Sequence, residues 1–177
     1  MRVVVIGLIG VALSGELPTE GPAVPPPAAA SDMASAEPPG ARAARLERRH
    51  LARLGVLAGA SAVAGGVVAG VGWEDPRLQS AGLMTVGWAA VDAVIVAAAW
   101  KSTARPRTAE ELAASREFLQ LNLGLDVGYV ATGVAMGVLG RMDDRPAVEG
   151  AGWAVAAQGL SLAVLDGILL AELPKRF

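Results

Sequence analysis

Residues 121–133 read LNLGLDVGYVATG, an apolar helical stretch that carries Asn122 and Asp126 one helical turn apart. Tyr129 follows three residues after Asp126, so the three polar side chains share one helix face. An ionisable residue at the centre of a membrane helix costs at least about 2.5 kcal/mol on the insertion scale. We therefore expect this polar ridge to face the interior of a helical bundle rather than lipid.

The composition of the whole chain makes the bilayer the expected solvent. Of its 177 residues, 53% are hydrophobic and 18% are charged, whereas charged residues make up about a quarter of an ordinary soluble domain. The chain has two Phe and one Tyr, so its helices are expected to pack through small side chains. A formal net charge of −2, with arginines grouped near the ends of apolar segments, gives no basis for a nucleic-acid partner.

The cysteine and histidine counts narrow the chemistry further. The absence of Cys excludes a thiolate nucleophile, an iron–sulfur cluster and a cysteine zinc site. The single histidine, His50, excludes a multi-histidine metal site within one chain. We predict no cofactor, no metal site, no catalytic residue and no enzymatic activity. A membrane enzyme limited to Asp general acid–base chemistry is the least favoured alternative.

Four apolar stretches each approach the roughly 20 residues that a spanning helix needs. Short connections join the first to the second and the third to the fourth, which predicts two antiparallel hairpins. A soluble bundle would need a polar stripe along each helix, and these stretches lack one. The predicted fold class is all-α: a four-helix transmembrane bundle with a disordered N-terminal tail. The predicted spans are about 51–73, 79–100, 118–140 and 151–171.

The residues before the first span divide into three parts. Residues 1–14 have a positive charge at Arg2, a short apolar run and small residues near a cleavage point after Ser14, which is typical of a signal peptide; a short uncleaved anchor is the alternative. Residues 15–43 form a Pro/Ala-rich tail that is expected to be disordered. The membrane domain is predicted to cover 44–177. Its lead-in, ARAARLERRH (41–50), is expected to be a helix at the interface that runs directly into the first span, with arginines extending toward head groups.

Local signals add detail to the third span and to helix packing. Thr108 and Glu111 have the spacing of a capping box, which predicts that the third helix begins in water before it enters the membrane. Glycines four residues apart favour close approach of two helices within the bundle. These pairs are Gly55/Gly59, Gly66/Gly70, Gly124/Gly128 and Gly133/Gly137.

Three aspartates, Asp92, Asp126 and Asp166, lie inside three different spans. With neighbouring spans antiparallel and a rise of about 1.5 Å per residue, they are displaced from the span midpoints by roughly 3, 5 and 8 Å, all toward the middle connection. The three carboxyls can thus share one layer, with Gln158 in the fourth span as an additional polar group. The predicted buried polar layer, which doubles as the candidate ion site, comprises Asp92, Asn122, Asp126, Tyr129, Gln158 and Asp166.

Two functions fit this layer. It can be interhelical hydrogen-bond glue in a structural or interaction bundle, or a proton or cation site in a small transporter or channel component. The structural role is preferred, because small-residue helices leave little room for a substrate cavity and no span is broken by Pro.

The motif around Asp126, with GWAAVDAVIVA (87–97) before it and AAQGLSLAVLDG (156–167) after it, resembles an uncharacterised family of small bacterial membrane proteins. The family is known only as a domain of unknown function, and the resemblance covers roughly 51–171. It implies a signal peptide, a variable tail, four spans and an N-x-G-L-D-V-x-Y motif in the third span, here Asn122 to Tyr129. Relatives often have Asn in the second span, where this chain has Asp92. The resemblance implies no activity.

The expected location is the bacterial inner membrane, with the lipid bilayer as the principal partner and either a second copy or another membrane protein beside it. Signals for orientation disagree. A signal peptide would export the tail, whereas eleven basic residues on the tail side against three on the other favour a cytoplasmic tail. We prefer an exported tail, since the first translocated segment usually dominates. The eleven are Arg42, Arg45, Arg48, Arg49, Arg53, Lys101, Arg105, Arg107, Arg116, Lys175 and Arg176; the three are Arg77, Arg141 and Arg145.

Overall fold

The computed structural model describes residues 37–174, and this part of the chain consists of helices and short connections without a strand. The predicted all-α, four-helix class is confirmed. The predicted signal peptide (1–14) and most of the predicted tail lie outside the described residues. The helices are α2 (Pro39–Val71), α3 (Pro76–Ala99), the 3-10 turn η1 (Trp100–Ala104), α4 (Ala109–Met142) and α5 (Pro146–Glu172).

The helical lead-in expected at 41–50 is continuous with the first span in α2, which begins at Pro39, four residues before the predicted end of the tail at 43. Proline is favoured there because its missing N–H would have no helical partner and its φ already suits a helix. Pro76 and Pro146 start α3 and α5 in the same way.

All four long helices are long and apolar enough to cross a membrane. Large apolar side chains on their outer surfaces are exposed, including Val63 and Val67 on α2 and Val94 on α3. In water such an apolar surface would promote aggregation, whereas in a bilayer it contacts apolar acyl chains. These features indicate a multi-pass membrane protein.

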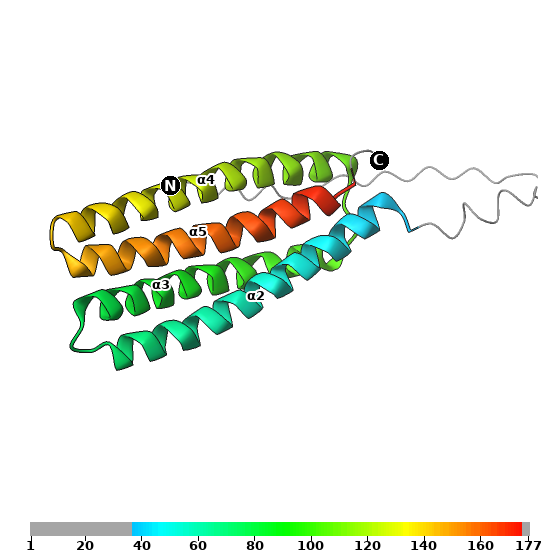
Figure 1. Cartoon of the computed structure of the whole chain (residues 1–177). Helices are drawn as coiled ribbons and strands as arrows, with labels where there is room; N and C mark the ends of the chain where they lie inside the picture. The colour runs from blue at the N-terminus through cyan, green and yellow to red at the C-terminus, as the bar shows by residue number, and fades with distance from the viewer. Residues whose placement is uncertain (1–36, 175–177) are drawn as a thin grey trace, which may run out of the picture. The chain divides into compact units, whose positions relative to one another are not determined.

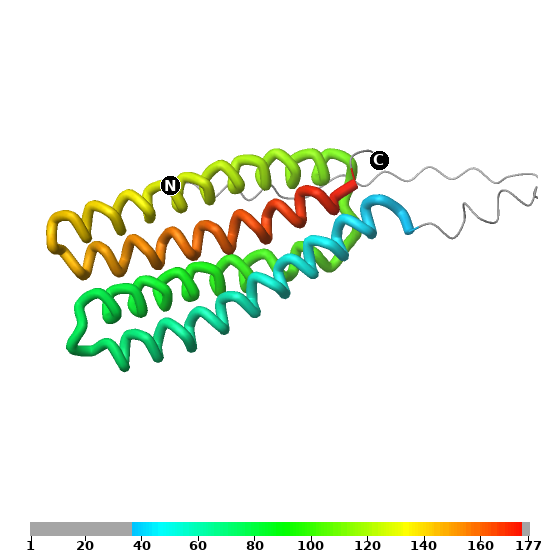
Figure 2. The backbone as a smooth tube through the Cα atoms, in the orientation of Figure 1, coloured from blue at the N-terminus to red at the C-terminus, as the bar shows by residue number. Residues whose placement is uncertain are grey.

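The helices form two antiparallel hairpins, α2/α3 and α4/α5, that meet along α3 and α5 (Figure 1). The α3 and α5 helices run in the same direction through the middle of the bundle, with α2 and α4 on the outside (Figure 2). Between residues 37 and 174, the backbones of α3 and α4 do not pack against each other. The bundle is therefore tight within each hairpin and open between α3 and α4.

Glycines set the closest helix contacts. A Cβ added at Gly65 would lie 2.8 Å from the carbonyl oxygen of Gly82, and one added at Gly159 would lie 2.9 Å from that of Asp126. Gly133 and Gly137 also meet α5 closely. The expected pair Gly133/Gly137 is therefore used within the bundle, whereas Gly59, Gly66, Gly70, Gly124 and Gly128 face open space and Gly55 makes only ordinary contact.

The two ends of the bundle differ. At the end with the short connections, Arg77 of α3 pairs with Glu149 of α5 at 2.9 Å, and Ser80 Oγ donates to the carbonyl of Ala147. At the η1 end, the predicted capping box of Thr108 and Glu111 is confirmed. A small cluster of buried apolar side chains closes this second end, formed by Ala43, Leu46, Leu112, Leu119, Leu169 and Leu173.

Candidate intramembrane site

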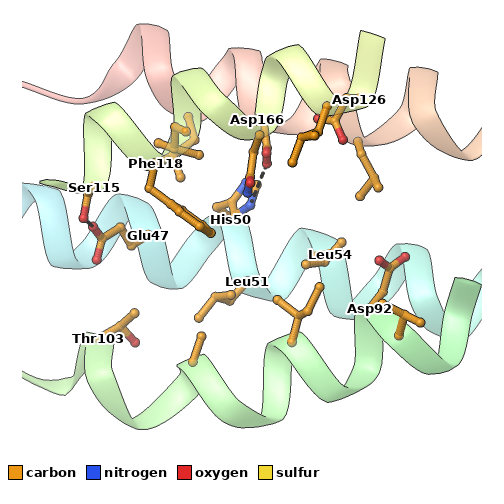
Figure 3. A pocket seen from close by; sticks show the side chains of 18 of the residues that line it. Glu47, His50, Leu51, Leu54, Asp92, Thr103, Ser115, Phe118, Asp126 and Asp166 are labelled. Atoms are coloured by element: carbon orange, nitrogen blue, oxygen red, sulfur yellow. Dashed lines mark hydrogen bonds and ion pairs between the residues drawn. The ribbon is translucent and has the colours of Figure 1, made fainter. Parts of the chain in front are cut away.

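A cavity of about 450 Å³ lies inside the half of the bundle nearest η1 (Figure 3). All four long helices contribute to its lining. Most of its surface is apolar, and its polar groups include one ionisable side chain or more from each helix: Glu47 and His50, Asp92, Asp126, and Asp166. The sequence predicted little room for a substrate cavity, whereas the bundle holds this one beside the gap between α3 and α4, whose backbones do not pack together.

The imidazole of His50 on α2 and the carboxyl of Asp166 on α5 meet at the cavity, with Nε2 of His50 3.2 Å from Oδ1 of Asp166. Figure 3 shows the imidazole and the carboxyl pointing at each other between the two helices. Each side chain is only 11% exposed. Nδ1 of His50 is buried and has no hydrogen-bond partner among the described residues.

Asp92 and Gln158 make a second interhelical contact. Nε2 of Gln158 on α5 donates to Oδ2 of Asp92 on α3 over 2.6 Å. Asp92 is 1% exposed and Gln158 is 5% exposed, so this hydrogen bond is shielded from competing solvent. It joins the two hairpins where α3 and α5 pack.

Asp126 of α4 is the exceptional carboxyl. It is only 4% exposed, and its Oδ2 has no hydrogen-bond partner in residues 37–174. Buried polar atoms nearly always have a partner, and an unsatisfied one calls for a specific explanation. Asp126 lies against Gly159 of α5, which lets the two backbones approach, and it lines the cavity.

Asn122 and Tyr129, the other members of the predicted ridge on α4, also line the cavity. Neither side chain makes a hydrogen bond to any described residue. Tyr129 instead packs edge-to-face on Trp88 of α3, with ring centroids 5.0 Å apart. This aromatic pair spans the gap between α3 and α4, whose backbones do not touch.

A polar group closer to the η1 end was not foreseen from the sequence. Glu47 of α2 accepts hydrogen bonds from Nε of Arg107 at 2.6 Å and from Oγ of Ser115 at 2.9 Å. Glu47 is buried, so its charge is compensated by the guanidinium and by the hydroxyl. Arg107 lies in the connection between η1 and α4, and its backbone N–H donates to the carbonyl of Gly40.

Exposed charges at the same end form surface pairs. The two hydrogen bonds that Arg45 donates to Glu37 lower the pKa of that carboxyl below its ordinary value. In the η1–α4 connection, a hydrogen bond to Glu111 raises the pKa of Arg105. Neither pair lines the cavity.

The structure brings all six residues of the predicted layer to the cavity or directly beside it. Gln158 bonds Asp92, and the other five line the cavity wall. The sequence did not reveal that His50 and Glu47 join them, because both belong to the arginine-rich stretch assigned to the interface. In the described part of the chain, no three His, Asp or Glu side chains come close enough together to hold a metal ion.

A family model described as a family of unknown function (DUF6992) matches residues 53–167. The chain belongs to this family. The match includes Asp92, Asp126, Gln158 and Asp166, and it begins after Glu47 and His50. The DUF6992 region therefore contains three of the four cavity carboxyls, whereas the imidazole that contacts Asp166 lies outside it. No curated protein and no solved structure matches the chain.

Proposed function

We propose that this DUF6992 protein is a membrane protein whose bundle binds and releases a proton, or exchanges it for a cation, at the carboxyls of the cavity. The observation that carries the proposal is Asp126, a buried carboxyl with an unpartnered oxygen that lines the cavity. A buried carboxylate without a partner is costly, whereas a protonated carboxyl or a bound cation removes most of that cost. Intramembrane carboxyls with these properties mark ion and proton pathways.

A route from water to Asp126 supports the proposal. With 33 residues, α2 is roughly 50 Å long, longer than the about 30 Å of bilayer hydrocarbon. Its first turns, near Glu47 and Arg107, therefore fit the head-group region. From there the polar groups of the cavity continue inward through His50 and Asp166. The titratable and charged groups that face the cavity are Glu47, His50, Asp92, Arg107, Asp126, Tyr129 and Asp166.

A second candidate function is purely structural, and the Asp92–Gln158 hydrogen bond favours it. This bond links one hairpin to the other, as interhelical polar contacts do in membrane bundles. In that case the layer fixes the pairing of α3 with α5, and Asp126 stays protonated and exchanges neither a proton nor a cation. Under either function the protein acts in the bilayer. We place it in a bacterial inner membrane, beside a second copy or another membrane protein.

Infrared difference spectroscopy separates the two functions. The full chain in lipid nanodiscs is titrated with acid and base, with and without Na⁺, K⁺ and Ca²⁺, while the band of protonated carboxyls is recorded. We expect the band to weaken as the pH rises. Asp126→Asn should remove that response, whereas Asp143→Asn, in the exposed turn between α4 and α5, should keep it.

A band that ignores both pH and cations would contradict the proton or cation site and favour the structural role. Circular dichroism and size-exclusion profiles of the two variants provide the check that both fold. If Asp126→Asn does not fold, the titration of the unmodified protein still decides, because a carboxyl response requires no variant.

A further inference from the structure

We infer that the cavity takes an organic monocation, an alkylammonium head on a short apolar body, that enters from the lipid between α3 and α4. This inference deepens the proposed function by naming the chemical class of ligand for the same site. The first step compares the acidic and basic side chains that line the cavity. The two basic side chains that line the cavity, His50 and Arg107, already lie against Asp166 and Glu47. Asp92 and Asp126 are left with no cationic side chain within ion-pair distance in residues 37–174.

The second step is the position of aromatic rings beside these two carboxyls. Trp88 lies one helical turn before Asp92 on α3, and Tyr129 lies one turn after Asp126 on α4. The two rings touch each other, with centroids 5.0 Å apart. Each of the two carboxyls that lack a cationic partner thus has an aromatic ring on its own helix face. An ammonium group binds favourably near carboxylates and over the faces of Trp and Tyr.

The third step is the opening. Four residues that line the cavity are also about half exposed or more: Val91 and Ile95 on α3, and Phe118 and Leu125 on α4. They form the two apolar edges, or lips, of the gap between α3 and α4, the two helices that do not pack together. In a bilayer these lips face acyl chains, so a ligand with an apolar body can pass between them while its charged head reaches the carboxyls.

Other occupants fit less well. A metal ion lacks a sufficient ligand cluster in the part of the chain that the structure describes. A lipid acyl chain would match the apolar wall, but it would leave Asp92 and Asp126 without a cationic partner and Oδ2 of Asp126 without any partner. An anionic amphiphile would be repelled by the same carboxyls. A volume of about 450 Å³ is of the size used by small organic ligands.

The probe for this inference is hexyltrimethylammonium, with hexan-1-ol and hexyl sulfate as uncharged and anionic molecules of the same chain length. Equilibrium dialysis against the full chain in phosphatidylcholine nanodiscs measures binding, with empty nanodiscs as background. We expect saturable binding of one hexyltrimethylammonium per chain and no saturable binding of the other two. Asp126→Asn should weaken binding at least about tenfold and Trp88→Leu roughly two- to fivefold, whereas Asp143→Asn should not change it.

Equal binding of hexan-1-ol, or unchanged affinity in Asp126→Asn, would overturn the inference. If the variant does not fold, the infrared spectrum of the unmodified protein decides: the cation should displace the protonated-carboxyl band, and an unaltered band at saturating cation would overturn it. A band that titrates with pH in a protein that does not bind the probe would reject the ligand class and leave the proton site intact. A pH-insensitive band in a protein that binds the probe would reject the proton site and leave the ligand class intact.

Discussion

The four carboxyls of the cavity are each buried among different neighbours. Glu47 has a guanidinium and a hydroxyl, Asp166 has the imidazole of His50, and Asp92 has an amide. Asp126 alone has a buried oxygen without a partner. The four carboxyls thus differ in how far their neighbours satisfy them, and Asp126 is the least satisfied. A carboxyl without strong permanent partners is the one that can change its charge state, since strong partners would hold it in one state.

The hydrogen bond between Gln158 and Asp92 permits a direct test at the residue scale. Gln158→Leu removes the donor and leaves a buried carboxyl oxygen unsatisfied, so we expect the free energy of unfolding in detergent micelles to fall by about 1–3 kcal/mol. The matched control is Gln120→Leu on the exposed surface of α4, which should change the free energy by no more than about 0.5 kcal/mol. Equal effects of the two substitutions would show that the 2.6 Å contact contributes nothing to stability.

His50 is the only histidine of the chain, so its imidazole can be observed without assignment. Nε2 lies 3.2 Å from Oδ1 of Asp166, and an ionised carboxyl can only accept a hydrogen bond. We expect Nε2 to carry a hydrogen, and ¹⁵N NMR of histidine-labelled protein measures this directly. Asp166→Asn should shift the Nε2 resonance. A hydrogen on Nδ1 with a bare Nε2 would mean instead that Asp166 is protonated and acts as the donor.

At the scale of helices, the sequence predicted the number and type of elements better than their contacts. Apolar length and the capping box of Thr108 and Glu111 are local properties, so they located the four helices and the start of α4. Glycine spacing was less informative, because it identifies a smooth helix face without saying whether a neighbour lies against it. Gly133 and Gly137 meet α5, whereas Gly124 and Gly128 of the same helix face open space.

This difference between glycines yields a paired prediction. A Cβ at Gly159 would lie 2.9 Å from the carbonyl oxygen of Asp126 and from Cβ of Tyr129, so Gly159→Ala must push α5 away from α4. We expect a loss of about 1–3 kcal/mol in unfolding free energy and a changed carboxyl infrared band. Gly124→Ala has no neighbour within 4 Å and should stabilise α4 by up to about 1 kcal/mol through helix propensity. Thermal unfolding in micelles measures both, and a tolerated Gly159→Ala would contradict the packing.

At the scale of the whole molecule, part of the site could be predicted from the depth of each aspartate within its helix. Asp92, Asp126 and Asp166 share one region because antiparallel helices of known rise place them at similar depths, and this needs no tertiary information. The contact between His50 and Asp166 joins residues far apart in sequence through the packing of α2 on α5, which no local pattern specifies. The cavity arises from the gap between α3 and α4, a property of the whole bundle.

The orientation of the bundle in the membrane follows from the same whole-molecule geometry. The start of α2 and the η1 turn lie at one end, and the turn between α4 and α5 lies at the other (Figure 1). If residues 1–14 export the N-terminus, Ala104 faces the outside and Asp143 the cytoplasm.

The chain has no Cys, so Ala104→Cys and Asp143→Cys each give one reactive thiol at an exposed position. In intact bacterial cells, we expect a membrane-impermeant maleimide to label Ala104→Cys alone, and Asp143→Cys only after permeabilisation. The reverse pattern would show that the arginines near α2 and η1 determine the orientation and that residues 1–14 do not export the chain, which would put the water-facing end of the polar route in the cytoplasm. Labelling of both thiols in intact cells would contradict the membrane-spanning bundle itself.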